Sequence, residues 1–124
     1  MFEVETMQER KSYRRIDAME AQALLAQGDV LLLDVRDKAS FQQGAIEGAR
    51  HVSIDNLSAM IQSLPKKLPI LIYCFHGYAS QEYAQTFSDF GFQNVSSLDG
   101  GFEAWKRRPL PAMEIEKGKP FRVE

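Results

Sequence analysis

The chain contains a single cysteine, Cys74, at the head of the segment CFHGYAS (residues 74–80). A lone cysteine cannot form an intrachain disulfide, and it cannot build a cysteine-rich zinc site, so no metal is expected here. Three roles are left for it, which are a small buried hydrophobic residue, an intermolecular bridge and a reactive thiol.

The position of Cys74 favours the reactive thiol. An apolar run over residues 70–74 predicts a buried strand that ends at Cys74, and Gly77 lets the following loop curl before a helix begins at Ala79. In open parallel sheets, ligands and chemistry gather beyond the carboxyl ends of the strands. Inward-facing loop amides and a helix N-terminus lower the pKa of a cysteine. The same loop would hold a persulfide, Cys74-S-S⁻, without a metal or an organic cofactor.

Other polar side chains have structural interpretations that outweigh catalytic ones. Asp34 and Arg36 alternate on one face of a strand end, which favours an ion pair that fixes neighbouring loops, and Asp99 is similar. His76 could be charged beside a thiolate and help to hold an anion, although a loop histidine is more often a hydrogen-bonding residue. His51 has no local partner that suggests chemistry.

The elements that must position Cys74 follow an alternation of apolar runs and amphipathic stretches, which is typical of consecutive βα units. Asp17 and Glu20 have the spacing of a capping box, which predicts a helix over residues 17–27. A longer helix is predicted from Ala79 to a stop at Gly91. The predicted strands cover residues 30–35, 50–53, 70–74 and 94–98, and shorter helices cover residues 40–43, 55–63 and 102–106.

These elements predict one three-layer α/β domain over residues 13–111, between an N-terminal arm (1–12) and a C-terminal arm (112–124). The length of 124 residues suits one domain. Fifteen Lys and Arg against seventeen Asp and Glu give a net charge of −2, which argues against nucleic-acid binding. No apolar run reaches the roughly 20 residues of a membrane helix, and residues 1–15 lack a signal-peptide core. A cytoplasmic protein without a membrane partner is therefore expected.

Four motifs together resemble the rhodanese homology domain, and most of all its small single-domain thiosulfate sulfurtransferases of the GlpE type. They are DVR (34–36), GAIEGA (44–49), the loop headed by Cys74, and LDGGFEAW (98–105). Their order and spacing match the family over roughly residues 13–111. The resemblance implies a five-stranded parallel sheet flanked by helices, with Cys74 as the sulfur-carrying residue.

The resemblance also implies a reaction. The Cys74 thiolate takes the outer sulfur of an anionic donor such as thiosulfate, holds it as a persulfide, and gives it to cyanide, a thiol or a protein acceptor, which predicts ping-pong kinetics. The loop amides would stabilise the charge, as in an oxyanion hole. The residues expected to supply these amides are Phe75, His76, Gly77, Tyr78 and Ala79.

The expected donor site departs from vigorous members of the family, which often carry Arg or Lys in the loop. No Lys or Arg occurs in residues 68–105. Anion binding would then depend on loop amides, on a protonated His76, or on Arg36 or Arg50 from elsewhere in the chain. We therefore expect a modest affinity for thiosulfate.

Two other functions compete with sulfur transfer. Dual-specificity phosphatases and arsenate reductases of the related fold use a longer Cys-x5-Arg loop, but the residue six positions after Cys74 is Ser80. A phosphoryl transition state would then lack its bidentate clamp. Non-catalytic rhodanese-like interaction modules commonly lack the cysteine, which this chain has.

Overall fold

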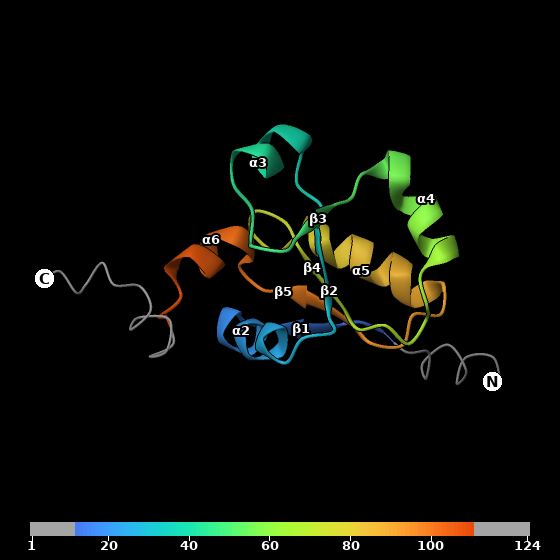
Figure 1. The fold of residues 1–124 in the computed structure, drawn as a ribbon, viewed down its shortest axis with the longest axis horizontal. Helices are drawn as coiled ribbons and strands as arrows, with labels where there is room; N and C mark the ends of the chain where they lie inside the picture. Colours follow the sequence, from blue (N-terminus) through green and yellow to red (C-terminus); the bar gives the residue numbers. More distant parts are fainter. Residues whose placement is uncertain (1–11, 111–124) are drawn as a thin grey trace, which may run out of the picture.

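Five parallel strands form the centre of the computed structural model, which describes residues 12–110 (Figure 1). The strands are β1 (Arg14–Ile16), β2 (Leu31–Asp34), β3 (Arg50–His51), β4 (Ile70–Tyr73) and β5 (Val95–Leu98). They lie in the order β1-β5-β4-β2-β3. The structure confirms the predicted five-stranded parallel sheet.

Helices cover both faces of the sheet, because successive strand side chains point to opposite sides. In β4, Ile70 and Ile72 pack into one apolar cluster, and Leu71 and Tyr73 pack into the other. The first cluster lies under α4 (Ile54–Ser63) and α5 (Ala79–Asp89), and the second lies under α2 (Ala18–Ala26) and α6 (Gly101–Arg107) (Figure 1). The predicted three-layer α/β architecture is correct.

Local sequence signals account for the helix ends. The predicted capping box is present at α2, where the Asp17 carboxylate accepts from the Glu20 amide at 2.9 Å and the Asp17 amide donates to the Glu20 carboxylate at 2.9 Å. Ser53 and Asn56 form a second capping box at α4. The short α3 (Lys38–Gln43) is capped by Asp37 and has no buried residue.

Two sequence predictions need correction. β1 was not located from the sequence because it is three residues long, begins with two exposed arginines, and pairs only along β5 at the edge of the sheet. β4 ends at Tyr73, so Cys74 is the first residue after the strand and not its last. Sγ is thereby placed in the loop, next to the first turn of α5.

The two predicted terminal arms, residues 1–12 and 112–124, lie outside the described residues except for Ser12. None of the helices in the described range combines the length and the apolar character needed to cross a membrane.

Candidate active site

The sulfur of Cys74 lies at the N-terminus of α5, where it accepts hydrogen bonds that a helix cap would normally accept. The amides of Gly77 and Ser80 donate to Sγ at 3.2 Å and 3.3 Å, and the Ser80 hydroxyl oxygen lies 3.4 Å away. α5 has no side-chain cap of its own. Because the first amides of a helix lack intrahelical acceptors, the sulfur satisfies one of them, the Ser80 amide, together with the loop amide of Gly77. Cys74 is 6% exposed.

These contacts change the acidity of the thiol. Burial of Sγ raises the pKa of Cys74, but hydrogen bonds from the Ser80 hydroxyl and from the Ser80, Gly77 and His76 amides outweigh burial, and the pKa lies below that of an ordinary cysteine. A thiolate is the nucleophilic form of the residue. The geometry therefore favours the reactive thiol over the small buried hydrophobic residue.

The N-terminus of α6 holds the loop from the other side. The Phe102 amide donates to the Cys74 carbonyl at 2.8 Å, and the Glu103 amide donates to the Phe75 carbonyl at 3.3 Å. In a trans peptide the carbonyl and the next N–H point in opposite directions, so the Phe75 and His76 amides point away from α6. A side chain at Gly101 has no room, since its Cβ would lie 2.5 Å from the Cys74 carbonyl oxygen.

A glutamine fixes the middle of the loop. The Gln81 side chain donates to the Gly77 carbonyl at 2.7 Å and accepts from the Tyr13 hydroxyl at 2.9 Å. Gly77 has a φ of 98°, and its Cβ position lies 2.8 Å from the Gly100 amide nitrogen. The positive φ and the close approach of backbone both require glycine here. The loop geometry is therefore determined by contacts with Tyr13, which precedes β1, with α5 and with the turn before α6.

A shallow pocket of about 230 Å³ opens beside Cys74. Phe75 and Tyr78 are exposed on its rim, with exposed fractions of 39% and 78%. Its lining residues are Val35, Arg36, Cys74, Phe75, His76, Tyr78 and Ala79. The pocket is large enough for a small anion but does not enclose one.

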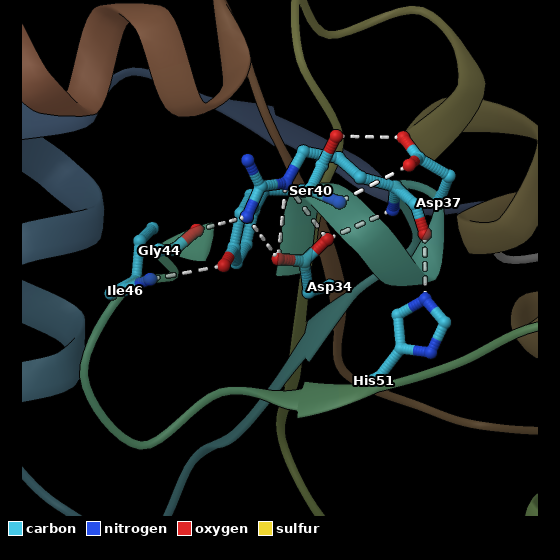
Figure 2. Close-up of polar contacts among 8 residues, drawn as sticks. Asp34, Asp37, Ser40, Gly44, Ile46 and His51 are labelled. Carbon is cyan, nitrogen blue, oxygen red and sulfur yellow. Dashed lines mark hydrogen bonds and ion pairs between the residues drawn. The ribbon is translucent and has the colours of Figure 1, made fainter. Parts of the chain in front are cut away.

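The predicted Asp34–Arg36 ion pair is present and buried, and Arg36 lines this pocket. Figure 2 shows the polar contacts around Asp34. Arg36 Nη2 donates to Asp34 Oδ2 at 2.8 Å and to the Gly44 carbonyl at 2.6 Å, and Nε lies 3.1 Å from both Asp34 oxygens. The guanidinium lies over the rings of Phe75 and Phe102, at 5.1 Å and 4.3 Å from their centroids. The ion pair thus holds the Arg36 guanidinium in contact with the Phe75 ring.

Two further side chains complete this network. The Tyr73 hydroxyl accepts from the Ile46 amide at 3.0 Å, and burial followed by a hydrogen bond with Asp34 raises the pKa of Tyr73. His51 Nε2 lies 2.6 Å from the Arg36 carbonyl oxygen, as drawn in Figure 2. This contact agrees with the structural role predicted for His51. Asp99 forms an exposed ion pair with Arg15 at 2.9 Å.

Loss of the buried charge at Asp34 is expected to destabilise the fold. The variant Asp34→Asn leaves the Arg36 guanidinium buried without a counter-charge, which costs about 3 to 5 kcal/mol of unfolding free energy. Urea unfolding measures the loss. The matched control, Asp99→Asn, removes one partner of an exposed pair and is expected to leave the unfolding free energy nearly unchanged. Equal losses in the two variants would contradict a supporting role for the buried pair.

The structure places the predicted site residues around Cys74, with different contacts for each. The Gly77 amide reaches Sγ, and the His76 amide contributes to the lowered pKa. Phe75, Tyr78 and Ala79 line the pocket, and the role of their amides toward an outer sulfur stays a prediction. Arg36 also lines the pocket, but Asp34 and Gly44 occupy its Nε and Nη2 atoms, and its binding of the donor stays a prediction.

Sequence reasoning missed two serines. The amide of Ser80 reaches Sγ and its hydroxyl lies beside it, and Ser97 lies 2.8 Å from Ser80 between the hydroxyl oxygens. Ser80 was considered only as the position where a phosphatase would have arginine. The sequence signal for Ser97 was its place in β5, where two consecutive serines, Ser96 and Ser97, stand in an interior strand. Both are buried at positions where apolar residues are usual.

The fold and the site define an α/β domain with a lone cysteine just after a strand, whose sulfur accepts hydrogen bonds from backbone amides and whose pKa is lowered. Residues 17–108 match the family profile described as "Rhodanese-like domain". The chain belongs to this family, which confirms the resemblance found in its sequence motifs.

Similar proteins agree with this assignment. A protein of Coxiella burnetii named thiosulfate sulfurtransferase GlpE is 40% identical over 94 residues, which cover 76% of this chain and 88% of that protein. A protein of the same name from Tolumonas auensis is 39% identical over 94 residues, covering 76% and 89%. The crystal structure of a rhodanese-related protein from Thermoplasma volcanium matches with a TM-score of 0.68 at 24% identity, covering 80% of this chain and 96% of that one. This last likeness concerns the fold alone.

Proposed function

We propose that this protein is a thiosulfate sulfurtransferase in which Cys74 carries sulfur as a persulfide. The observation that supports it most is Cys74 Sγ, which accepts two amide hydrogen bonds, has a lowered pKa, and lines an open pocket. The two relatives that share about 40% of their residues with this chain are named for the same activity. A thiolate with this geometry is suited to nucleophilic displacement at sulfur.

In the first half-reaction, the Cys74 thiolate attacks the outer sulfur of thiosulfate. A new S–S bond forms to Sγ, the S–S bond of thiosulfate breaks, and sulfite leaves with the bonding electron pair. Sγ loses its charge in the new bond, and the outer sulfur keeps the negative charge that it carried in thiosulfate, which gives the persulfide Cys74-S-S⁻. No proton is transferred, so this step depends on the fraction of Cys74 that is already ionised.

In the second half-reaction, a thiophilic acceptor attacks the outer sulfur. With cyanide, the new C–S bond yields thiocyanate, and the electron pair of the breaking S–S bond returns to Sγ as the thiolate. A thiol or a protein thiolate would accept the sulfur in the same way. Since Cys74 is the one cysteine in the chain, the sulfur passes directly to an external acceptor.

The outer sulfur and its donor would occupy the pocket beside Cys74, where loop amides bind negative charge. The loop has no lysine or arginine, and the Arg36 guanidinium is 2% exposed and paired with Asp34. The donor dianion is therefore held mainly by backbone N–H groups, which supports the expectation of a modest thiosulfate affinity. The exposed Phe75 and Tyr78 rings suit contact with an acceptor protein.

The pH dependence of sulfur loading tests the proposed function. Because hydrogen bonding lowers the pKa of Cys74, the thiolate persists below the pH at which a free cysteine is protonated, and loading slows only as the pH falls through this lowered pKa. Single-turnover sulfite release is measured against pH, beside the same reaction of N-acetylcysteine. We expect the midpoint for the protein to lie at the lower pH. A midpoint at or above that of N-acetylcysteine, or no sulfite release at all, would contradict the proposal.

The same samples separate the alternatives. A phosphatase of the related fold would release phosphate from an aryl phosphate, which we do not expect because Ser80 stands where the arginine clamp would be. A non-catalytic interaction module would show neither reaction. Sulfite release without phosphate release is the pattern that supports a sulfurtransferase.

A further inference from the structure

Two buried serine hydroxyls form a chain that ends on the Cys74 sulfur. Ser80, in the first turn of α5, and Ser97, in β5, are both 0% exposed. Their hydroxyl oxygens lie 2.8 Å apart, and Ser80 Oγ lies 3.4 Å from Cys74 Sγ. Within residues 12–110, Ser80 Oγ is the sole hydrogen-bond partner of Ser97 Oγ. Neither serine lines the pocket, so neither is placed to touch the donor.

Counting protons shows that the two hydroxyls cannot be oriented independently. Each hydroxyl has one proton to donate. If Ser80 donates to Ser97, then Ser80 can only accept from a Cys74 thiol, and the Ser97 proton has no acceptor in the described part of the chain. If Ser97 donates to Ser80, the Ser80 proton is left for Sγ. In this second arrangement both hydroxyl protons have an acceptor. It also gives a hydrogen-bond donor to a sulfur that carries negative charge and no proton.

We propose that Ser97 is a positioning residue that holds the Ser80 hydroxyl as a donor to Cys74 Sγ, and that this pair stabilises Sγ as the leaving group when the acceptor removes the outer sulfur. The inference rests on the proposed sulfurtransferase function and deepens it. Ser80 acts on the reacting atom, and Ser97 acts through Ser80. Donation from Ser97 also polarises the Ser80 hydroxyl and strengthens its bond to Sγ.

The two half-reactions differ in what the pair can do. During loading, Sγ begins as a thiolate and loses its charge as the new S–S bond forms and sulfite leaves, so a donor to Sγ stabilises the reactant and does not assist attack. During discharge, charge returns to Sγ as the S–S bond breaks, so the same donor stabilises the transition state. An interaction that is stronger in the transition state than in the ground state raises the rate of that step. The pair should therefore accelerate discharge and leave loading by a preformed thiolate unassisted.

The sheet provides a matched control residue. Ser97 faces α5 from β5, whereas its neighbour Ser96 is 1% exposed and bonds through its hydroxyl to Arg14 Nη2 at 3.3 Å. Ser96→Ala removes the same atom from the same strand without touching the hydroxyl chain. The double variant Ser80→Ala/Ser97→Ala removes both partners together and leaves no buried donor without an acceptor, which protects the fold.

The test measures loading and discharge separately in Ser80→Ala, Ser97→Ala, the double variant and Ser96→Ala. Single-turnover sulfite release is followed at a pH where Cys74 is fully ionised, and thiocyanate release is followed after cyanide is added to the persulfide form. We expect discharge to slow about tenfold in Ser80→Ala, as for a lost hydrogen bond to a charged group, and about threefold in Ser97→Ala. The double variant should match Ser80→Ala, and loading should not slow in any of the variants.

Three results would overturn the proposal. The first is a discharge rate of Ser97→Ala equal to that of Ser96→Ala. The second is a double variant whose discharge slows by the product of the two single effects. The third is a loading rate that falls as much as the discharge rate in Ser80→Ala or Ser97→Ala.

The pH profile of Cys74 alkylation by iodoacetamide tests the same proposal without any sulfur transfer. Ser97→Ala should move its midpoint to higher pH, and the shift should vanish when Ser80 is already alanine. Arg36, His76 and Tyr78 line the pocket with Cys74, and Glu103 of α6 contacts the loop through its backbone amide; all four are retained in every variant. If the wild-type protein never takes up sulfur, the proposed function fails, while alkylation still decides whether Ser97 acts through Ser80.

Discussion

Replacement of Cys74 by alanine is expected to lower thiocyanate formation from thiosulfate and cyanide by more than about a thousandfold, to the uncatalysed background. No second thiol is present to take over, because Cys74 is the only cysteine in the chain. The amides of Gly77 and Ser80 would still be present, but they would have no sulfur to stabilise. Initial rates at saturating cyanide measure the loss.

The same variant separates the reactive thiol from the small buried hydrophobic residue. Removing the buried sulfur should cost about 1 to 3 kcal/mol of unfolding free energy, since alanine fits the same backbone but leaves the Gly77 and Ser80 amides without their acceptor. A urea unfolding curve is the control. Retained transfer in Cys74→Ala would contradict the proposed mechanism, and a large loss of stability would show that the cysteine serves mainly in packing.

Insertion of a methyl group at Gly101 is expected to have the second largest effect. Gly101 has a φ of 59°, and a Cβ there would overlap the carbonyl groups of Cys74 and Phe75. Those carbonyls accept from the first amides of α6, so they cannot turn away without loss of the hydrogen bonds that orient the loop. We expect Gly101→Ala to lower the unfolding free energy by about 2 to 5 kcal/mol, through left-handed strain and overpacking.

The displaced loop should also lose activity in the molecules that stay folded. Sulfur loading in Gly101→Ala is expected to fall at least about tenfold, because Sγ would lose well-aligned amide donors. Gly28→Ala is the matched control, since Gly28 has a φ of 81° but no atom within 4 Å of its Cβ position. It should show the backbone strain without the loss of activity. Similar effects in both variants would contradict the role of the α6 turn in holding the loop.

The interior of the fold could be predicted from the sequence because its signals are local. Continuous apolar runs identified β2 and β4, and the Asp17–Glu20 spacing identified the start of α2. β1 carries no such signal, because its two arginines are exposed and β5 is the one strand with which it pairs. Its existence depends on pairing with residues about eighty positions away, which no local pattern reports.

The site was predictable in part for the same reason. The position of Cys74 after a buried strand and before a glycine loop indicated a sulfur nested in amides, and the Gly77 contact agrees with this. The hydroxyl chain from Ser97 could not be predicted, since it joins β5 to α5 through a tertiary contact. The hydrogen bond that Arg36 donates to the Gly44 carbonyl likewise forms only in the folded chain, so the sequence does not show it.

The central claim is that Cys74 carries sulfur, and intact-mass measurement after thiosulfate treatment tests it most directly. The protein is incubated with thiosulfate, freed of excess reagent, weighed, digested to locate any adduct, and weighed again after cyanide. The Coxiella burnetii relative, treated alongside, is the positive control. We expect a gain of one sulfur atom, located on Cys74 and removed by cyanide as one equivalent of thiocyanate. A folded protein that gains no sulfur while the relative is loaded would contradict it.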